Sequence, residues 1–131
     1  MIFAWDELKK IAAENLDAAR RRLMDILCNY AGYCKCVPIL VFDAYRVKGA
    51  GREQETWHNL HVIYTREAET ADMFIERATH ELAKNHRVRV VSSDGAEQII
   101  ILGNGALRVS ARAFEREVRA VEAEIREFLD Q

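Results

Sequence analysis

The chain has 131 residues, a length that suits one domain with its own hydrophobic core. Half of the residues are hydrophobic and 31% are charged, a balance typical of a folded globular protein rather than a disordered one. The formal net charge of −2 argues against a protein that holds nucleic acid by bulk positive charge. No apolar run approaches the roughly 20 residues that span a bilayer, so we expect a cytoplasmic protein with no membrane partner.

An amphipathic helix is predicted from Trp5 to about Tyr30, because apolar residues recur there at three- and four-residue steps. Asp6 is expected to cap the start of this helix, and Gly32 is expected to end it. Residues 37–42 then form a continuous apolar run, which predicts a strand buried on both faces of a parallel sheet.

Asp43 follows this strand directly, and the carboxyl edge of a parallel sheet is where open α/β proteins bind their ligands. The alternative for Asp43 is a carboxylate that only caps a turn. A basic loop with two glycines comes next, and its Arg46, Lys48 and Arg52 are candidates to hold a phosphate backbone. A merely solvated loop fits the same residues.

The stretch from Glu69 to Glu76 carries three carboxylates, and it follows a strand predicted at 60–64. If the helix includes the whole stretch, Glu69, Asp72 and Glu76 form one acidic ridge, since residues three and four apart share a face. Like charges so placed repel by about 0.2–0.5 kcal/mol per pair, unless a cation lies between them. The alternative is an ordinary helix start, in which Thr70 is the N-cap and the helix dipole stabilises the acids.

A third strand is predicted at 87–92, and Ser93 and Asp94 follow it. Asp94 and Glu97 have the spacing of a capping box, which predicts a short helix beginning there. Asp94 would also reach the same sheet edge as Asp43. The two roles do not exclude each other.

A closing amphipathic helix is predicted from Ser110, its N-cap. The order of these elements indicates a three-layer α/β domain with a central parallel sheet flanked by helices. Carboxylates that gather without thiol or imidazole neighbours favour a hard cation, Mg²⁺ or Mn²⁺. Such a cation activates water and stabilises the charge of a phosphodiester under attack.

Three segments of the chain together resemble the YacP-like NYN domains of the PIN-like nuclease superfamily. The segments are 41–44 with the basic loop, 69–76, and 93–98 with the following 102–111. The resemblance covers almost the whole chain and implies a single domain over residues 1–131 with a PIN-like fold. The family includes a bacterial ribosome-associated endoribonuclease that cuts messenger RNA during translation. A metal-dependent endoribonuclease with RNA and the ribosome as partners is therefore implied.

The resemblance also implies roles for individual residues. By position, Asp43, Asp72 and Asp94 match the aspartates of the family and would hold Mg²⁺ or Mn²⁺. Glu69 and Glu76 would position the attacking water or complete the ligand shell. The implied substrate contacts are Ser93, Glu97, Arg46, Lys48 and Arg52.

The family begins with a strand ending in Asp-Gly-Tyr-Asn, and the first residues of this chain match the segment just after that motif. The resemblance therefore implies a domain truncated at its N-terminus, with a strand missing from the middle of the sheet. Either the chain is a fragment or a late start of a longer protein, or another segment or copy fills the gap. A second hypothesis is a non-catalytic RNA- or ribosome-binding module, for example the C-terminal part of a translation-factor GTPase fusion. A third expectation is a homo-oligomer formed through exposed sheet edges.

Overall fold

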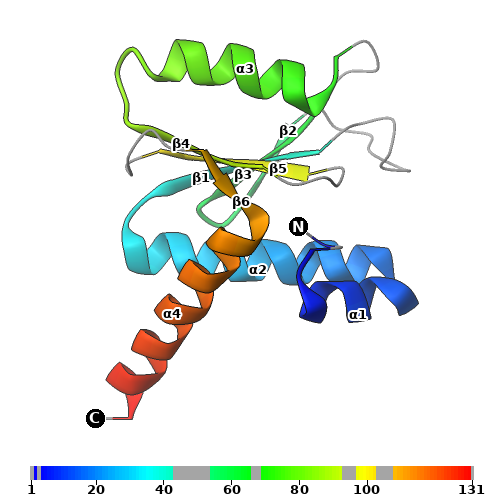
Figure 1. Cartoon of the computed structure of the whole chain (residues 1–131), viewed down its shortest axis with the longest axis vertical. Helices are drawn as coiled ribbons and strands as arrows, with labels where there is room; N and C mark the ends of the chain where they lie inside the picture. The colour runs from blue at the N-terminus through cyan, green and yellow to red at the C-terminus, as the bar shows by residue number, and fades with distance from the viewer. Residues whose placement is uncertain are drawn as a thin grey trace.

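The computed structural model describes residues 2, 4–42, 54–65, 69–92, 97–102 and 108–130. A six-stranded sheet lies between two helical layers, with α3 on one face and α1, α2 and α4 on the other (Figure 1). The predicted three-layer α/β architecture is confirmed. The elements are α1 (Asp6–Glu14), α2 (Leu16–Cys34), β1 (Val37–Phe42), β2 (Gln54–Trp57), β3 (Leu60–Tyr64), α3 (Ala71–Leu82), β4 (Val88–Ser92), β5 (Glu97–Leu102), β6 (Arg108–Ser110) and α4 (Ala111–Leu129).

The sheet is mixed, and the expectation of a wholly parallel sheet was wrong. Its strand order is β2-β3-β1-β5-β4-β6. β1 pairs with β3 and β4 with β6 in parallel, whereas β5 is antiparallel to both of its neighbours and β2 is antiparallel to β3. A short connection explains the antiparallel pairing of β4 and β5. Only residues 93–96 separate β4 from β5, and a parallel crossover needs a dozen residues or more.

β5 also corrects the short helix predicted from the spacing of Asp94 and Glu97. Ile99, Ile100 and Ile101 are each fully buried, with alternate side chains on opposite faces of the sheet. A run of β-branched residues buried on two faces fits a central strand better than a surface helix. Within the described strands the middle of the sheet has no gap, because β5 pairs with β1 on one side and β4 on the other.

The N-terminal helix was predicted as one element and is two. Asn15 adopts an extended conformation and breaks the helix, and its side chain accepts a hydrogen bond from the Ala18 amide at 3.1 Å to cap α2. Asp6 is the first residue of α1 rather than its cap. Gly32 lies within α2, which ends at Cys34 and is followed by the C-cap Lys35 in the left-handed conformation, with φ 54°. The C-terminal cap position therefore lies three residues beyond the expected glycine.

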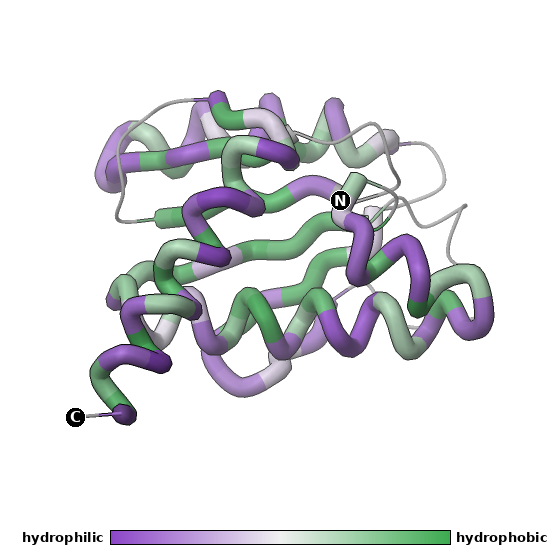
Figure 2. Tube along the Cα trace, turned by 60° about the horizontal axis from the view of Figure 1, so that its bottom comes forward, coloured by the Kyte–Doolittle hydropathy of each residue, from purple (hydrophilic) through white to green (hydrophobic). Residues whose placement is uncertain are grey.

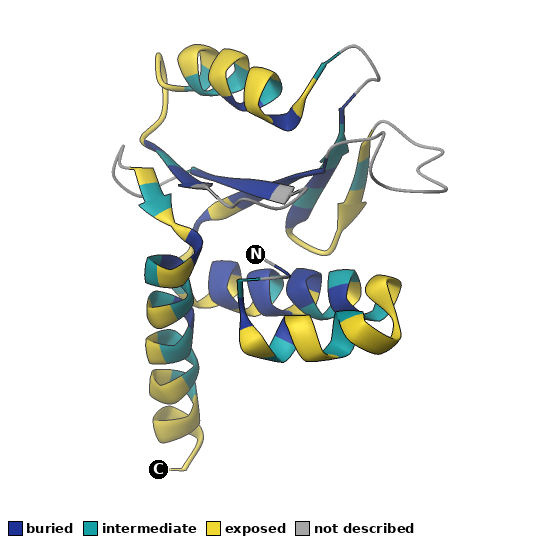
Figure 3. Cartoon of the chain, turned by 45° about the vertical axis from the view of Figure 1, so that its right-hand side comes forward, coloured by how far each residue is buried: buried dark blue, intermediate teal, exposed yellow. Residues whose placement is uncertain are grey.

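The hydrophobic core lies on both sides of the sheet, whose strands are the most apolar part of the chain (Figure 2). The larger cluster lies between the sheet and α1, α2 and α4, around Trp5, Leu27 and Phe114. The smaller lies beneath α3 and includes Val41 and Ile75. Burial is greatest on the sheet and the inner face of α2, whereas the distal half of α4 is exposed (Figure 3). No helix in the described part of the chain is long and apolar enough to cross a membrane.

Candidate active site

The carboxyl ends of β1, β3, β4 and β6 lie at one edge of the sheet. Phe42 at the end of β1 is in register with Tyr64 at the end of β3, and Ser92 at the end of β4 is in register with Ser110 of β6. β5 runs the other way, so it begins at this edge, where Glu97 lies opposite Phe42. Phe42 and Ser92, the described residues that come before two of the predicted acidic segments, therefore lie at this edge, where α/β proteins place their ligands.

The start of α3 is fixed above this edge. Thr70 caps the helix, as predicted, because its hydroxyl accepts a hydrogen bond from the Met73 amide at 3.2 Å. Ala71 and Ile75 are buried against the sheet, and the helix packs mainly on β5 and β1. Asp72 is thereby placed in the first turn of α3 with an exposed side chain. The exposed amides of that turn favour a carboxylate.

Asp72 is held from below by Gln98, a residue to which the sequence assigned no role. The Gln98 side-chain amide (Nε2) donates a hydrogen bond to Oδ1 of Asp72. Gln98 is 6% exposed and lies opposite Val41 in the register of β1 and β5. Burying an amide without a partner costs about 1–3 kcal/mol, so the bond to Asp72 is what makes this position tolerable. One sequence signal could have found it, because Gln98 is a polar residue directly before the apolar run of β5.

The other two carboxylates of the predicted ridge are placed differently from each other. Glu76 is exposed on α3 one turn after Asp72, so these two carboxylates share a face. Glu69 precedes the Thr70 cap and is not helical. It pairs with Arg77 at 3.0 Å, so its charge is already partly compensated. The acidic ridge expected on one helix is therefore divided. Asp72 and Glu76 lie on α3, whereas Glu69 lies before the helix and is paired with Arg77.

The remaining predicted site residues cannot be placed around Asp72. Glu97 is the first residue of β5, and the structure describes only its backbone. Within the described ranges, no group of three or more His, Cys, Asp or Glu residues could hold a metal ion, so the three-aspartate metal set stays a prediction. Its other two members and most of the predicted substrate contacts lie outside the described residues: Asp43, Asp94, Ser93, Arg46, Lys48 and Arg52.

An aromatic pair lies beside the same edge, on the face opposite α3. The rings of Phe42 and Tyr64 stack with their centroids 5.6 Å apart, and the Tyr64 hydroxyl donates to Glu55 at 3.1 Å. Burial, and then the charge of Glu55, raises the pKa of Tyr64 to about 12. Tyr64 therefore stays protonated at neutral pH and acts as a hydrogen-bond donor rather than a base.

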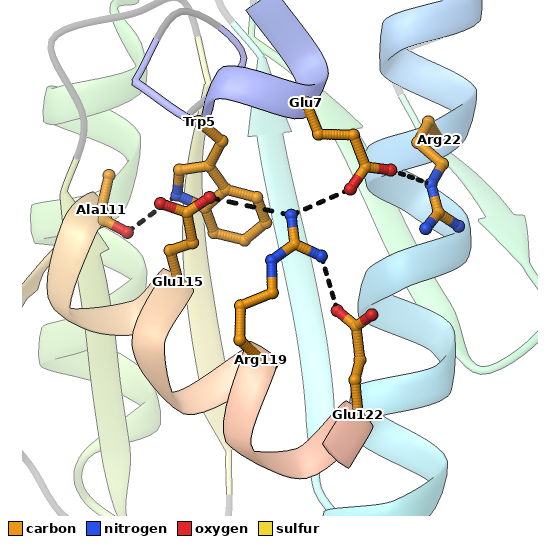
Figure 4. A network of polar contacts seen from close by, with 7 residues as sticks. All are labelled: Trp5, Glu7, Arg22, Ala111, Glu115, Arg119 and Glu122. Atoms are coloured by element: carbon orange, nitrogen blue, oxygen red, sulfur yellow. Dashed lines mark hydrogen bonds and ion pairs between the residues drawn. The ribbon is translucent and has the colours of Figure 1, made fainter. Parts of the chain in front are cut away.

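The start of α4 is anchored by the N-terminal segment (Figure 4). The buried Trp5 indole nitrogen donates to the Ala111 carbonyl at 2.8 Å. Arg119 pairs with Glu7 at 2.9 Å and with Glu122 at 2.7 Å, so it joins α1 to α4. Because Ala111 follows directly after β6, this network fixes the helical layer behind the sheet edge that carries Asp72.

A mixed sheet between helical layers, with a helix-start carboxylate at its carboxyl edge, defines an α/β domain of the PIN-like class. Comparison with known proteins names the family. The model of the YacP-like NYN domain matches residues 1–131, and the chain belongs to this family. Membership indicates a ribonuclease-type function, and divalent metals are common in the family.

Relatives from Bacillus subtilis agree with this assignment. The chain is 42% identical over 126 residues to the uncharacterized protein YacP, a match that covers 95% of this chain and 74% of YacP. It is similar to the crystal structure of Rae1 (YacP), with a TM-score of 0.77 and 34% identity over 98% of this chain and 74% of that one. A mutant form of Rae1 matches with a TM-score of 0.73 and 33% identity over 96% of this chain and 74% of that one.

Proposed function

We propose that this chain is a metal-dependent endoribonuclease that cleaves RNA, with messenger RNA on the ribosome as its substrate. The observation that carries the proposal is the placement of Asp72. It is an exposed carboxylate at the carboxyl edge of the sheet, held by a buried amide, in a member of the YacP-like NYN family. Asp72 is not needed as the N-cap of α3, because Thr70 already fills that role.

Asp72 and Glu76 supply carboxylate oxygens, the donors that Mg²⁺ and Mn²⁺ prefer, so these side chains fit the proposed cation. Asp43 and Asp94 are proposed to complete the site, as the family resemblance implies. A bound cation lowers the pKa of water and stabilises charge on a phosphodiester. The chain itself contributes orientation, because Gln98 and the first turn of α3 hold Asp72 in place.

Binding of RNA is proposed to be local rather than general. The net charge of −2 leaves little bulk attraction for a polyanion, so the contacts must come from a few residues. Arg46, Lys48 and Arg52 are proposed to contact the RNA backbone, and Ser93 and Glu97 the nucleotides beside the scissile bond. A few phosphate contacts predict a shallow dependence of affinity on salt concentration.

The test is cleavage of a labelled single-stranded RNA, free and bound to ribosomes, with Mg²⁺ or Mn²⁺. We expect cleavage that EDTA abolishes and that Asp72→Asn slows by about 100-fold or more, the scale of losing one electrostatic group from an active site. Asp130→Asn is the matched control, because this exposed aspartate lies at the far end of α4. Its rate should equal that of the unaltered chain.

Two results would overturn the proposal. Equal cleavage by Asp72→Asn, in a preparation free of contaminating nuclease, would show that the carboxylate takes no part. Saturable binding to RNA or ribosomes without any metal-dependent cleavage would instead identify a non-catalytic binding module.

A further inference from the structure

Two polar side chains are buried in the described part of the chain, and both adjoin the end of β1. They are Thr65, 4% exposed, and Gln98, 6% exposed. The Thr65 amide donates to the Phe42 carbonyl at 3.0 Å, and Gln98 lies opposite Val41. The Trp5 indole nitrogen and the Thr79 hydroxyl are buried elsewhere, but Thr65 and Gln98 are the two polar residues of the described core, and both lie at the edge that carries Asp72.

The position of Gln98 in β5 determines on which face of the sheet its side chain lies. Alternate residues of a strand point to opposite faces, so Gln98 shares its face with Ile100, which packs beneath α3. Ile99 and Ile101 pack on the other side, against the larger core. An apolar residue at position 98 would fill the same space without an amide to satisfy. Packing therefore does not explain the glutamine, whereas its contact with Asp72 does.

We propose that Gln98 is a positioning residue that fixes the orientation of the Asp72 carboxylate for cation binding. This role rests on the proposed function. Asp72 is exposed, and a solvated carboxylate can rotate freely about its terminal torsion. A donor fixed in the sheet favours one orientation, because the hydrogen bond from Gln98 Nε2 to Oδ1 is best aligned when the donor lies near the plane of the carboxylate. Outer hydrogen-bond partners hold ligating carboxylates in this way in metal sites.

The test is a cycle of four proteins: the unaltered chain, Gln98→Met, Asp72→Asn and the double variant. Methionine is close to glutamine in length and lacks the amide donor, so the melting temperature should change by no more than about 4 °C. Mn²⁺ affinity is measured from the free Mn²⁺ signal in electron paramagnetic resonance. Ile100→Val is the matched control, because it alters the same face of the same strand without touching Asp72.

We expect Gln98→Met to weaken Mn²⁺ binding by about 10- to 100-fold, the usual effect of losing an outer partner of a metal ligand. In the Asp72→Asn background the same change should have no further effect, because Gln98 acts through Asp72. Ile100→Val should bind Mn²⁺ as the unaltered chain does.

The outcomes separate this inference from the proposed function. Unchanged affinity in Gln98→Met together with a loss in Asp72→Asn would overturn the positioning role and leave the proposed function standing. An equal loss from Gln98→Met in both backgrounds would also overturn it, since Gln98 would then act independently of Asp72. Unchanged affinity in Asp72→Asn, or no saturable Mn²⁺ binding by the unaltered chain, would count against both.

Discussion

Replacing Trp5 by phenylalanine tests whether the N-terminal segment anchors the start of α4. Trp5 is fully buried, its indole nitrogen donates to the Ala111 carbonyl at 2.8 Å, and its ring lies 6.1 Å from that of Phe114. Phenylalanine keeps an aromatic ring in the core but removes the donor and part of the ring volume.

The expected loss has two parts. A net hydrogen bond contributes about 1 kcal/mol to stability. The small cavity left by the shorter ring costs about 1 kcal/mol more. A total of about 2 kcal/mol corresponds to a fall of about 6–9 °C in melting temperature for a chain of this length.

Urea unfolding followed by far-ultraviolet circular dichroism measures this loss without using tryptophan fluorescence. Trp57→Phe is the control, since the second tryptophan of the chain lies at the end of β2 and is 37% exposed. That variant should stay within about 0.5 kcal/mol of the unaltered chain, as surface substitutions usually do. Equal stability losses for the two variants, or no loss in Trp5→Phe, would refute the anchoring role.

Three further predictions concern the cap, the arginine beside the site, and pH. Thr70→Ala should cost about 1 kcal/mol in urea unfolding because the Met73 amide loses its acceptor, whereas Thr70→Ser should retain the cap and the stability. Arg77→Gln should change stability by at most about 1 kcal/mol, because the Arg77 side chain is 67% exposed. The same variant should bind Mn²⁺ more tightly, because Glu69 loses its ion pair with Arg77. Unchanged Mn²⁺ affinity would show that Glu69 takes no part in the metal site. Burial raises the pKa of the Cys36 thiol from 9.0 to about 11, so the folded state holds this proton more tightly than the unfolded state. The contribution of this proton to the free energy of unfolding should therefore be fully present below about pH 9 and be lost as pH rises toward 11. Urea unfolding at about pH 8 and about pH 10.5 measures this loss, which should be smaller in Cys36→Ala.

The features that the sequence predicted correctly depend on neighbouring residues. Thr70 and Ser110 were identified as helix caps because a short polar side chain precedes an amphipathic pattern, and both accept the expected amide. The strands at 37–42 and 60–64 have the predicted bounds, since short apolar runs bounded by polar residues are strong local signals.

The features that it missed depend on distant contacts. A short apolar run fits a strand or a buried helix equally well, so only pairing with β1 and β4 decided the structure of 97–102. The helix break at Asn15 interrupts an apolar periodicity that continues on both sides. The contact between Gln98 and Asp72 joins two elements that are 26 residues apart, and no spacing rule connects them.

The most direct test of the acidic edge is paramagnetic broadening of amide signals by Mn²⁺ added below stoichiometric amounts. If the cation binds at Asp72, the amides of Ala71, Asp72 and Gln98 should broaden first. Those of Lys35 and Trp57, at the opposite edge of the sheet, should stay sharp. Broadening that centres on other described residues, or that spreads evenly over the chain, would contradict a metal site at this edge.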